Sequence, residues 1–324
     1  MALYLVIDAG GTKTRCLLAD DTRILARAET GTVKLMRVAE AEATERFRAM
    51  LGELAASAHV ALADVRHICF GLAGSRSESV QTWARKAIAE SGVGGDLSIC
   101  GDEEIALDAA FQGGPGILVI AGTGSNAIGR ATDGKLFGAG GWGPVLGDEG
   151  SGYWIGLEAI RASLRALDQD PRCDKAAGRS MVLLGAIQRH LGVASLGELV
   201  ALANLRAPSA NAGPPDFAAL APVVASCAAA GELIAVSVLR RAGEELASLA
   251  AKVHRKLEVA DPNSGLAPRI EVAFTGSILD RIPQVHEAFG AGIAAAIPSA
   301  RVQPNAVDPL AGALYRARLG SSSG

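Results

Sequence analysis

A short glycine-rich turn between two apolar runs occurs twice in this chain. The first copy, Asp8–Thr14, follows the apolar run Leu3–Ile7, and the second copy, Ala121–Asn126, follows Ile117–Ile120. Glycine tolerates positive φ and lets a ligand approach the backbone, so each copy predicts a strand, a tight turn and a second strand. Consecutive backbone N–H groups beside a Thr or Ser hydroxyl form a concave site for phosphate. Two such turns on two similar lobes predict a nucleotide held in the cleft between them, and hence phosphoryl transfer.

Composition excludes several classes of protein. An apolar content of 49% and a charged content of 20% predict a folded chain, and 324 residues suffice for two domains with separate cores. The net charge of -3 and the aromatic content of 4% argue against a nucleic-acid partner. No run is apolar enough to predict a membrane helix, and we expect no secretory signal. The five cysteines are scattered without a CxxC pair, which favours a reducing cytoplasm over a disulfide framework or a cysteine metal site.

The order of the predicted elements indicates an α/β fold. Apolar spacing predicts helices at residues 39–58, 78–90, 152–167, 222–259 and 309–319, and further strands at 65–70, 97–100 and 270–274. Strands that alternate with helices favour a mostly parallel or mixed sheet with helices on its faces. The clearest break is 112–116, so we place an N-terminal lobe at 1–114 and a C-terminal lobe at 115–307. We expect irregular backbone at 138–144 and a surface loop at 206–216.

Asp8 stands where the first strand ends and the first glycine turn begins. A carboxylate at this position could hold Mg²⁺ or its water shell beside the phosphates. An Asp next to Gly also caps turns, and for an isolated motif the two interpretations are about equally good. The second glycine turn favours function. That turn has Ala121 in place of the acid, so only the first lobe would supply a carboxylate to the metal.

Asp102 follows a short predicted strand at the end of the first lobe. Its carboxylate could accept a proton from a substrate hydroxyl that attacks the γ-phosphate. The run Gly101–Glu104 is also a good helix N-terminus, with a capping Asp followed by acids in the first turn. From the residues alone the capping role is favoured, and one side chain could serve both roles.

A third group of polar residues is Gly147–Gly152. It follows another glycine-rich segment, Gly140–Gly143, which contains Trp142. Adjacent carboxylates between glycines are costly to bury unless they bind something, so Asp148 predicts a clamp for sugar-like hydroxyls. A cap for the helix from Gly152 is the alternative, and core packing is the default role for a lone Trp. Thr275–Ser277 resembles a third ligand-facing turn, which would let a purine or ribose approach the backbone.

These motifs resemble the N-acetylglucosamine and bacterial glucosamine kinases, within the BadF/BadG/BcrA/BcrD-type ATPases of the actin, hexokinase and Hsp70 fold. The resemblance covers nearly the whole chain and is most specific at 141–156. Its motifs are Asp8–Thr12, Gly71–Gly74, Gly101–Asp102, Gly122–Asn126, Gly140–Gly143, Gly147–Ser151 and Phe274–Ser277. It implies two ribonuclease-H-like lobes with ATP in the cleft between them, a C-terminal helix at 308–320 that returns to the first lobe, and a homodimer.

The resemblance also assigns roles to residues. It makes Asp102 the catalytic base, while Asp8 is expected on the Mg²⁺ side from its place at the end of the first strand. By that likeness Thr12 and Thr123 contact the phosphates of ATP, and Gly276 and Ser277 lie near the adenosine. As members of the two glycine turns, Gly10, Gly11, Lys13, Gly122 and Gly124 are also expected to contact the phosphates. The sugar would be lined by Gly74, Ser125, Asn126, Gly141, Trp142, Gly143 and Asp148. The implied reaction is ATP-dependent phosphorylation of the 6-hydroxyl of an amino sugar, N-acetylglucosamine first and glucosamine as the alternative.

One segment departs from the family pattern. Family members commonly carry an Asn in the loop after the first hairpin, where it touches the sugar, and Gly31–Met36 contains none. This difference leaves the preferred sugar open. An ATPase that activates a partner reductase or dehydratase is a second class, but its relatives use paired cysteines that this chain lacks. A sugar sensor without turnover is a third, and the retained acids and turns argue against it.

Overall fold

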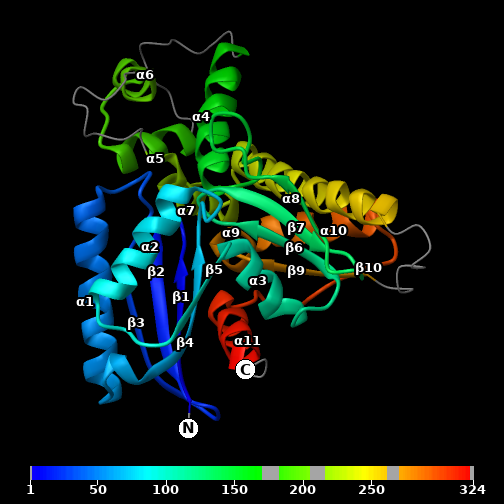
Figure 1. Cartoon of the computed structure of the whole chain (residues 1–324). Coiled ribbons are helices and arrows are strands. Elements are labelled where there is room, and N and C mark those ends of the chain that lie inside the picture. Colours follow the sequence, from blue (N-terminus) through cyan, green and yellow to red (C-terminus); the bar gives the residue numbers. More distant parts are fainter. Residues whose placement is uncertain (1, 170–181, 205–215, 261–269, 322–324) are drawn as a thin grey trace. The chain divides into compact units, whose positions relative to one another are not determined.

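Two five-stranded sheets organise the chain in the computed structural model, which describes residues 2–169, 182–204, 216–260 and 270–321 (Figure 1). The described residues divide into two compact units. Unit 1 consists of Met1–Leu118, Ile128–Leu136 and Val307–Gly324, and unit 2 of Val119–Ala127 and Phe137–Ala306.

The first sheet lies wholly in unit 1. Its strands are β1 (Leu3–Ala9), β2 (Lys13–Ala19), β3 (Ile24–Gly31), β4 (Val65–Leu72) and β5 (Asp96–Cys100). They lie in the order β3-β2-β1-β4-β5, and β1 pairs antiparallel with β2 and parallel with β4. The sheet is therefore mixed, as the alternation of strands and helices predicts. The first glycine turn joins β1 to β2 at the end of the central strand.

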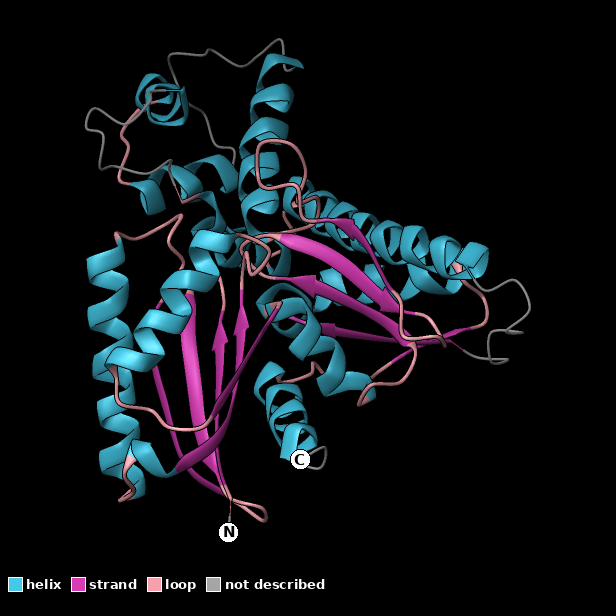
Figure 2. Ribbon diagram, viewed as in Figure 1, coloured by secondary structure: helices cyan, strands magenta, loops and turns pink. Residues whose placement is uncertain are grey.

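Helices cover both faces of this sheet (Figure 2). One face packs against α1 (Glu40–Ala58) and α2 (Glu78–Glu90), and the other against α3 (Asp102–Phe111) and the C-terminal helix α11 (Pro309–Ser321). Alternate β1 residues serve the two cores, with Leu5 and Ile7 on the first face and Tyr4 and Val6 on the second. Burial on both sides explains why β1 reads as a continuous apolar run. A short 3₁₀ helix, Leu62–Asp64, precedes β4.

The second sheet repeats the strand order of the first. Its strands are β6 (Gly116–Ala121), β7 (Ser125–Arg130), β8 (Leu136–Gly140), β9 (Ile270–Thr275) and β10 (Ala300–Val302). The order is β10-β9-β6-β7-β8, so each sheet has three successive strands followed by two more on the other side of the first. The second glycine turn joins β6 to β7 and thus has the same topological place as the first turn. The repeated glycine turn in the sequence therefore corresponds to a repeated sheet topology in the structure.

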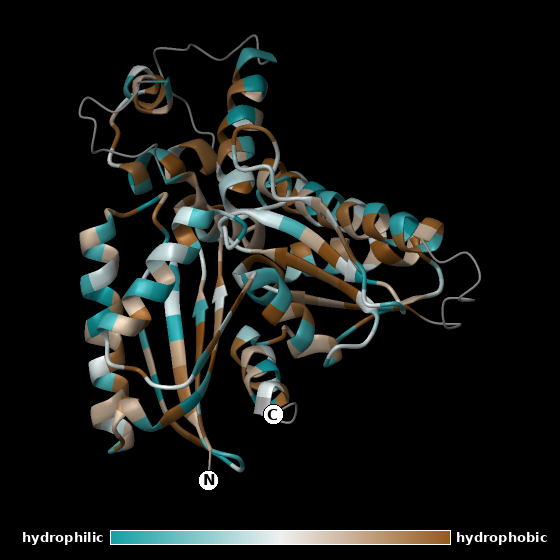
Figure 3. Cartoon of the chain, in the orientation of Figure 1, coloured by the Kyte–Doolittle hydropathy of each residue, from teal (hydrophilic) through white to brown (hydrophobic). Residues whose placement is uncertain are grey.

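The remaining helices belong to unit 2. They are α4 (Gly152–Gln169), α5 (Val182–Leu191), α6 (Leu196–Asn204), α7 (Ala221–Ala229), α8 (Leu233–Ala260), α9 (Ser277–Arg281) and α10 (Pro283–Ala296), with a 3₁₀ turn at Phe217–Leu220. The long helix α8 packs against α10, α7 and α4. Polar and apolar residues alternate along it in Figure 3, as expected for a helix with one buried side.

Three expectations need correction or fall outside the structure. The single helix predicted at 222–259 is wrong, because α7 ends at Ala229 and α8 begins at Leu233, with Gly231 at φ 85° between them. The irregular backbone predicted at 138–144 is wrong for its first part, where β8 runs to Gly140. The loop predicted at 206–216 lies, apart from its last residue, outside the described residues.

Candidate active site

The first glycine turn is closed by its own backbone. Gly10 N–H donates to the Lys13 carbonyl at 3.1 Å, and Thr32 Oγ1 donates to the Gly10 carbonyl at 3.0 Å. The N–H of Gly10 is therefore used within the turn. The Lys13 side chain lies at the surface, where its ammonium pairs with Glu29 at 3.3 Å. Of the residues predicted to contact phosphate at this turn, the Gly10 N–H and the Lys13 ammonium thus have partners within unit 1.

Asp8 is buried at the end of β1, directly before this turn. Its Oδ2 accepts a hydrogen bond from Arg15 at 2.7 Å, and the same guanidinium pairs with Asp308 at 3.0 Å. Burial raises the pKa of Asp8, and the Arg15 hydrogen bond opposes that rise. Asp8 and Arg15 face each other across β1 and β2, so the cation is placed by the hairpin itself.

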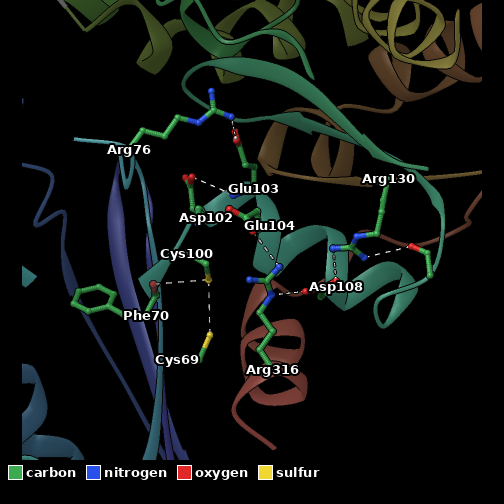
Figure 4. Close-up of polar contacts among 12 residues, drawn as sticks. Cys69, Phe70, Arg76, Cys100, Asp102, Glu103, Glu104, Asp108, Arg130 and Arg316 are labelled. Carbon is green, nitrogen blue, oxygen red and sulfur yellow. Dashed lines mark hydrogen bonds and ion pairs between the residues drawn. The ribbon is translucent and has the colours of Figure 1, made fainter. Parts of the chain in front are cut away.

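Asp102 is the first residue of α3, and the capping role predicted for it is wrong. The N-cap is Gly101, and Glu104 Oε1 accepts a hydrogen bond from the Gly101 N–H at 3.2 Å. The Asp102 carboxylate accepts from the adjacent Glu103 N–H at 3.1 Å (Figure 4). Capping is thus done by the third acid of the run. The predicted position at the end of β5 is where the structure has Asp102.

The surroundings of Asp102 shift its ionisation. Desolvation raises the pKa of Asp102 to about 6, with the Asp8 and Glu103 carboxylates adding to the rise and the Lys34 ammonium opposing it. A carboxyl group with a pKa near 6 is largely ionised at neutral pH and is still a better base than an ordinary Asp. Unit 1 therefore brings Asp8, Asp102 and Lys34 within electrostatic range of one another.

Lys34 lies in the loop Gly31–Met36, where the family pattern has an Asn. Hydrogen bonds hold this loop to the first hairpin, because Thr32 N–H donates to the Thr12 carbonyl at 3.1 Å and Val33 N–H to Thr14 Oγ1 at 3.2 Å. Lys34 is partly exposed. The loop is thus fixed beside the first glycine turn and carries a cation.

The second glycine turn in unit 2 closes in a similar way. Gly122 N–H donates to the Gly124 carbonyl at 2.9 Å, and the Gly122 carbonyl accepts from the Gly152 N–H at 2.8 Å at the start of α4. Gly276, at φ 97°, lies against the turn, because a Cβ there would be 2.3 Å from the Ala121 carbonyl oxygen. The predicted ligand-facing turn at Thr275–Ser277 is therefore brought to the second glycine turn.

Asp148 lies beside the same turn. Asp148 is buried, and its backbone has a φ of 60°. Its Oδ1 accepts a hydrogen bond from the Gly143 N–H at 3.1 Å. Its Oδ2 lies so close to Gly124 that a Cβ on Gly124 would be only 2.6 Å away, so the carboxylate needs a glycine there. Asp148 does not cap α4, since the Ser151 hydroxyl accepts from the Trp154 N–H at the third position of that helix. The helix-cap alternative for Asp148 is therefore wrong.

The remaining predicted sugar residues differ in their surroundings. Trp142 is 74% exposed, so the core-packing default is wrong for it. Ser125 is buried, and its hydroxyl donates to the Glu149 carbonyl at 2.7 Å, so it fixes the loop. Gly141 N–H donates to the Ser125 carbonyl at 3.0 Å, and a Cβ on Gly141 would lie 3.3 Å from Asn126 Cβ. Unit 2 thus gathers these residues around β7, while Gly74, at φ 81°, belongs to unit 1.

Sequence reasoning missed Arg15, Lys34 and Glu104. A basic residue opposite an acid in a predicted hairpin would have indicated Arg15, and the acid at the third helical position would have indicated Glu104 as the cap. Lys34 has no local signal, because its electrostatic effect on Asp102 acts between residues that are far apart in the sequence.

The fold and the two glycine turns define a two-unit α/β protein with duplicated sheet topology. Comparison with known proteins gives the family. The sequence profile of the BadF/BadG/BcrA/BcrD ATPase family matches residues 5–315, and the chain belongs to that family.

Individual relatives agree with this assignment. The N-acetylmuramic acid/N-acetylglucosamine kinase of Clostridium acetobutylicum is 26% identical over 98% of this chain and 99% of its own length. A solved protein of Chromobacterium violaceum, 26% identical, covers 97% of this chain and 99% of its own with a TM-score of 0.70. The glucokinase of the ROK family from Streptomyces griseus, solved with glucose and AMPPNP, is 17% identical with a TM-score of 0.54 over 98% of this chain and all of its own. The predicted actin-like kinase fold is confirmed.

Proposed function

We propose that this chain transfers the γ-phosphoryl group of ATP to the 6-hydroxyl of an amino sugar, with N-acetylglucosamine as the first candidate. The chain is a sugar kinase of its ATPase family, and the relative from Clostridium acetobutylicum, alike over the full length of both chains, acts on amino sugars. The observation that carries the proposal is Asp102, a carboxylate at the start of α3 whose pKa is raised to about 6 beside Asp8 and the first glycine turn.

In this proposal Asp102 accepts the proton of the sugar hydroxyl as that oxygen attacks the γ-phosphorus. The bond from the γ-phosphorus to the bridging oxygen of ADP breaks, and ADP leaves with the electron pair. General-base catalysis of this kind contributes about 10²- to 10⁴-fold. Positioning of the reactants and neutralisation of the phosphate charge supply the remainder.

Each glycine turn has backbone N–H groups that we assign to phosphate binding. The N–H groups of Gly11 and Thr12 in the first turn, and those of Thr123 and Gly124 in the second, are the donors that we assign to this role. In addition, Gly276 and Ser277 would lie near the adenosine. These assignments rest on the repeated turn and on the resemblance to the family.

Asp8 fits a magnesium ion that arrives with ATP. Mg²⁺ is commonly held by one or two carboxylates together with substrate phosphates and water. Asp8 is a single carboxylate at a phosphate turn, and the described residues contain no group of three or more His, Cys, Asp or Glu that could form a dedicated cage. The ion would neutralise charge on the phosphates, and the Arg15 hydrogen bond would orient the Asp8 carboxylate and oppose the rise of its pKa.

Asp148 would accept hydrogen bonds from the sugar hydroxyls, with Asn126, Gly141, Trp142 and Gly143 around it. The bond from Gly143 to Asp148 joins the two ends of this loop, so a sugar held by Asp148 would also order the loop.

Lys34 favours N-acetylmuramic acid as a second acceptor over glucosamine. The Lys34 loop is held to the first hairpin, and its cation acts on Asp102, so the charge lies near the proposed base. A carboxylate on the sugar would be attracted to it, whereas the ammonium of glucosamine would be repelled. The relative from Clostridium acetobutylicum is a kinase for both N-acetylated sugars.

Two further parts of the proposal concern the setting of the protein. We propose a homodimer, on the resemblance to the family, and a cytoplasmic location, on the scattered cysteines. The four cysteines among the described residues are buried free thiols. Among the described helices, none combines the length and the hydrophobicity that a membrane-spanning helix requires.

The position of transfer is tested by the product. Enzyme, Mg-ATP and N-acetylglucosamine should give one sugar phosphate, in which the ³¹P signal couples to the two protons on carbon 6. The control is 6-deoxy-N-acetylglucosamine, which lacks the acceptor hydroxyl and should give no sugar phosphate. A product phosphorylated at another carbon would overturn the 6-hydroxyl assignment while leaving the kinase activity intact.

A further inference from the structure

A group of four charged residues in unit 1 ties the C-terminal helix to the helix that carries Asp102. Glu104 and Asp108 lie one turn apart on α3, Arg316 comes from α11, and Arg130 from β7 (Figure 4). Arg316 Nη2 lies 3.2 Å from Glu104 Oε2, and its Nε donates to Asp108 Oδ2. Arg130 Nη2 lies 2.6 Å from Asp108 Oδ1 as an ion pair. The Arg316 guanidinium therefore bridges the Glu104 and Asp108 carboxylates of α3.

The bridge continues to the start of α3. The two oxygens of Glu104 have different partners, because Oε2 meets Arg316 and Oε1 accepts from the Gly101 N–H at 3.2 Å. Gly101 is the residue immediately before Asp102. Arg316 thus orients the carboxylate that holds the Cys100–Gly101 peptide, one residue before Asp102. Among the described residues Arg316 is the sole cation within 4 Å of Glu104.

Asp108 is the more deeply buried end of the bridge. It is 3% exposed, and its two oxygens are shared between Arg130 and Arg316. Removing one of the two cations from a buried carboxylate is strongly destabilising, so the ion pair with Asp108 keeps the Arg316 guanidinium in place. The same arginine then reaches the less buried Glu104. Asp108 therefore holds the Arg316 guanidinium in place, and the guanidinium in turn orients the Glu104 carboxylate.

Backbone packing leaves α3 little freedom in the direction of α11. A Cβ on Gly312 of α11 would lie 1.8 Å from the Ile105 carbonyl oxygen, so the two helices meet backbone to backbone. On its other side, Ile105 lies over Gly71 of β4, where a Cβ would be 2.2 Å from Ile105 Cδ1. Packing therefore sets the position of α3 from Ile105 onward, and residues 101–104 precede this contact.

We propose that Arg316 is a positioning residue for Asp102, acting through the Glu104 carboxylate and the Gly101 N–H. The proposal rests on the proposed role of Asp102 as the base. It assigns to the C-terminal helix a part in catalysis, since that helix supplies the group that fixes the first turn of α3. In this proposal Arg316 acts through Glu104 and has no direct role at ATP or sugar.

Arg316→Met tests the proposal, because methionine keeps an apolar stem but removes every donor. We expect kcat to fall by about 10-fold or more, as for a small misplacement of a catalytic group, while the KM values for ATP and sugar change by less than about 3-fold. Hydrogen–deuterium exchange of the amides at 101–105 should accelerate. Arg316→Lys keeps the charge without the planar fork and should fall between Met and the native residue.

Arg318→Met is the matched control. Arg318 lies on the same helix and donates to the Asp20 carbonyl at 2.7 Å, so it also anchors α11, but away from α3. Its loss should leave kcat and exchange at 101–105 close to native. Equal losses of kcat in the two variants, or native exchange at 101–105 in Arg316→Met, would overturn the positioning role. Hydrogen–deuterium exchange does not depend on turnover. If the native enzyme is inactive, that result counts against the proposed function. The exchange rates at 101–105 then still test whether Arg316 fixes the start of α3.

Discussion

Asp102 combines two properties that a proton acceptor needs, a fixed position at the start of a helix and a raised pKa. If it is the base, Asp102→Asn should lower kcat by about 10²-fold or more, because an amide cannot accept the proton. The KM values for sugar and ATP should stay within a few-fold. Steady-state kinetics with each substrate varied in turn give both quantities. Near-native turnover would remove Asp102 from the mechanism.

The pH dependence of the reaction tests the same residue from another direction. The pKa of Asp102 is raised to about 6, and the base must be ionised, so kcat/KM for the sugar should rise as the pH increases through about 6 and then level off. The Lys34 ammonium lowers this pKa. In Lys34→Gln the rise should therefore move to higher pH. A rise that stays in place, or moves to lower pH, would show that Lys34 does not act on the base.

Asp148 can be tested without disturbing its unusual backbone. Asn tolerates the positive φ of this position and keeps an oxygen for the Gly143 N–H, whereas Ala removes every acceptor. Asp148→Ala should raise the KM for the sugar by more than it raises the KM for ATP, and Asp148→Asn should do so to a smaller degree. Both constants come from initial rates. Equal effects on the two substrates would assign Asp148 to loop structure alone.

At the scale of elements, the contact between α3 and α11 depends on a single small residue. Gly312→Ala places a Cβ 1.8 Å from the Ile105 carbonyl oxygen and should destabilise the protein by about 1–3 kcal/mol or more. Gly52→Ala is the control in α1, where no atom lies within 4 Å of the added Cβ and better helix propensity should stabilise by up to about 1 kcal/mol. Thermal unfolding of the two variants should therefore shift Tm in opposite directions. A Tm for Gly312→Ala at or above the native value would contradict the close contact.

The elements also show what sequence reasoning could reach. The central hairpins follow from apolar runs interrupted by glycine, and both were predicted. Strands β3, β8 and β10 were not, and all three lie at sheet edges, where one side of the strand has no partner and the apolar signal weakens. The break at Gly231 was missed because alanine-rich segments on both sides keep helical spacing.

In the candidate site, too, some residues are indicated by the local sequence and others are not. Asp8, Asp102 and Asp148 stand next to glycines at predicted strand or helix ends, so local sequence indicates them. Arg316 lies 212 positions from Glu104, and no local pattern relates the two. Pairs of this kind depend on the packing of distant elements, so they become visible only in the folded chain.

At the scale of the whole molecule, the two sheets share a strand order, yet their turns are not equivalent. The first turn is preceded by Asp8 and the second by Ala121. Unit 1 also holds Asp102 and the Lys34 loop, while unit 2 holds Asp148 and the glycine-rich segment around Trp142. The two copies of the duplicated architecture therefore carry different residues at equivalent places, as expected if each copy serves a different substrate of the proposed reaction.

The central claim is that this chemistry is the phosphorylation of an amino sugar. The most direct measurement is coupled ADP release with Mg-ATP, comparing N-acetylglucosamine, N-acetylmuramic acid, glucosamine, glucose and a reaction without sugar. We expect ADP release to require an N-acetylated amino sugar and to be slower with glucosamine. ADP release that is equally fast without any sugar, or absent with all of them, would contradict the claim and point to an ATPase with a protein partner or to a sensor.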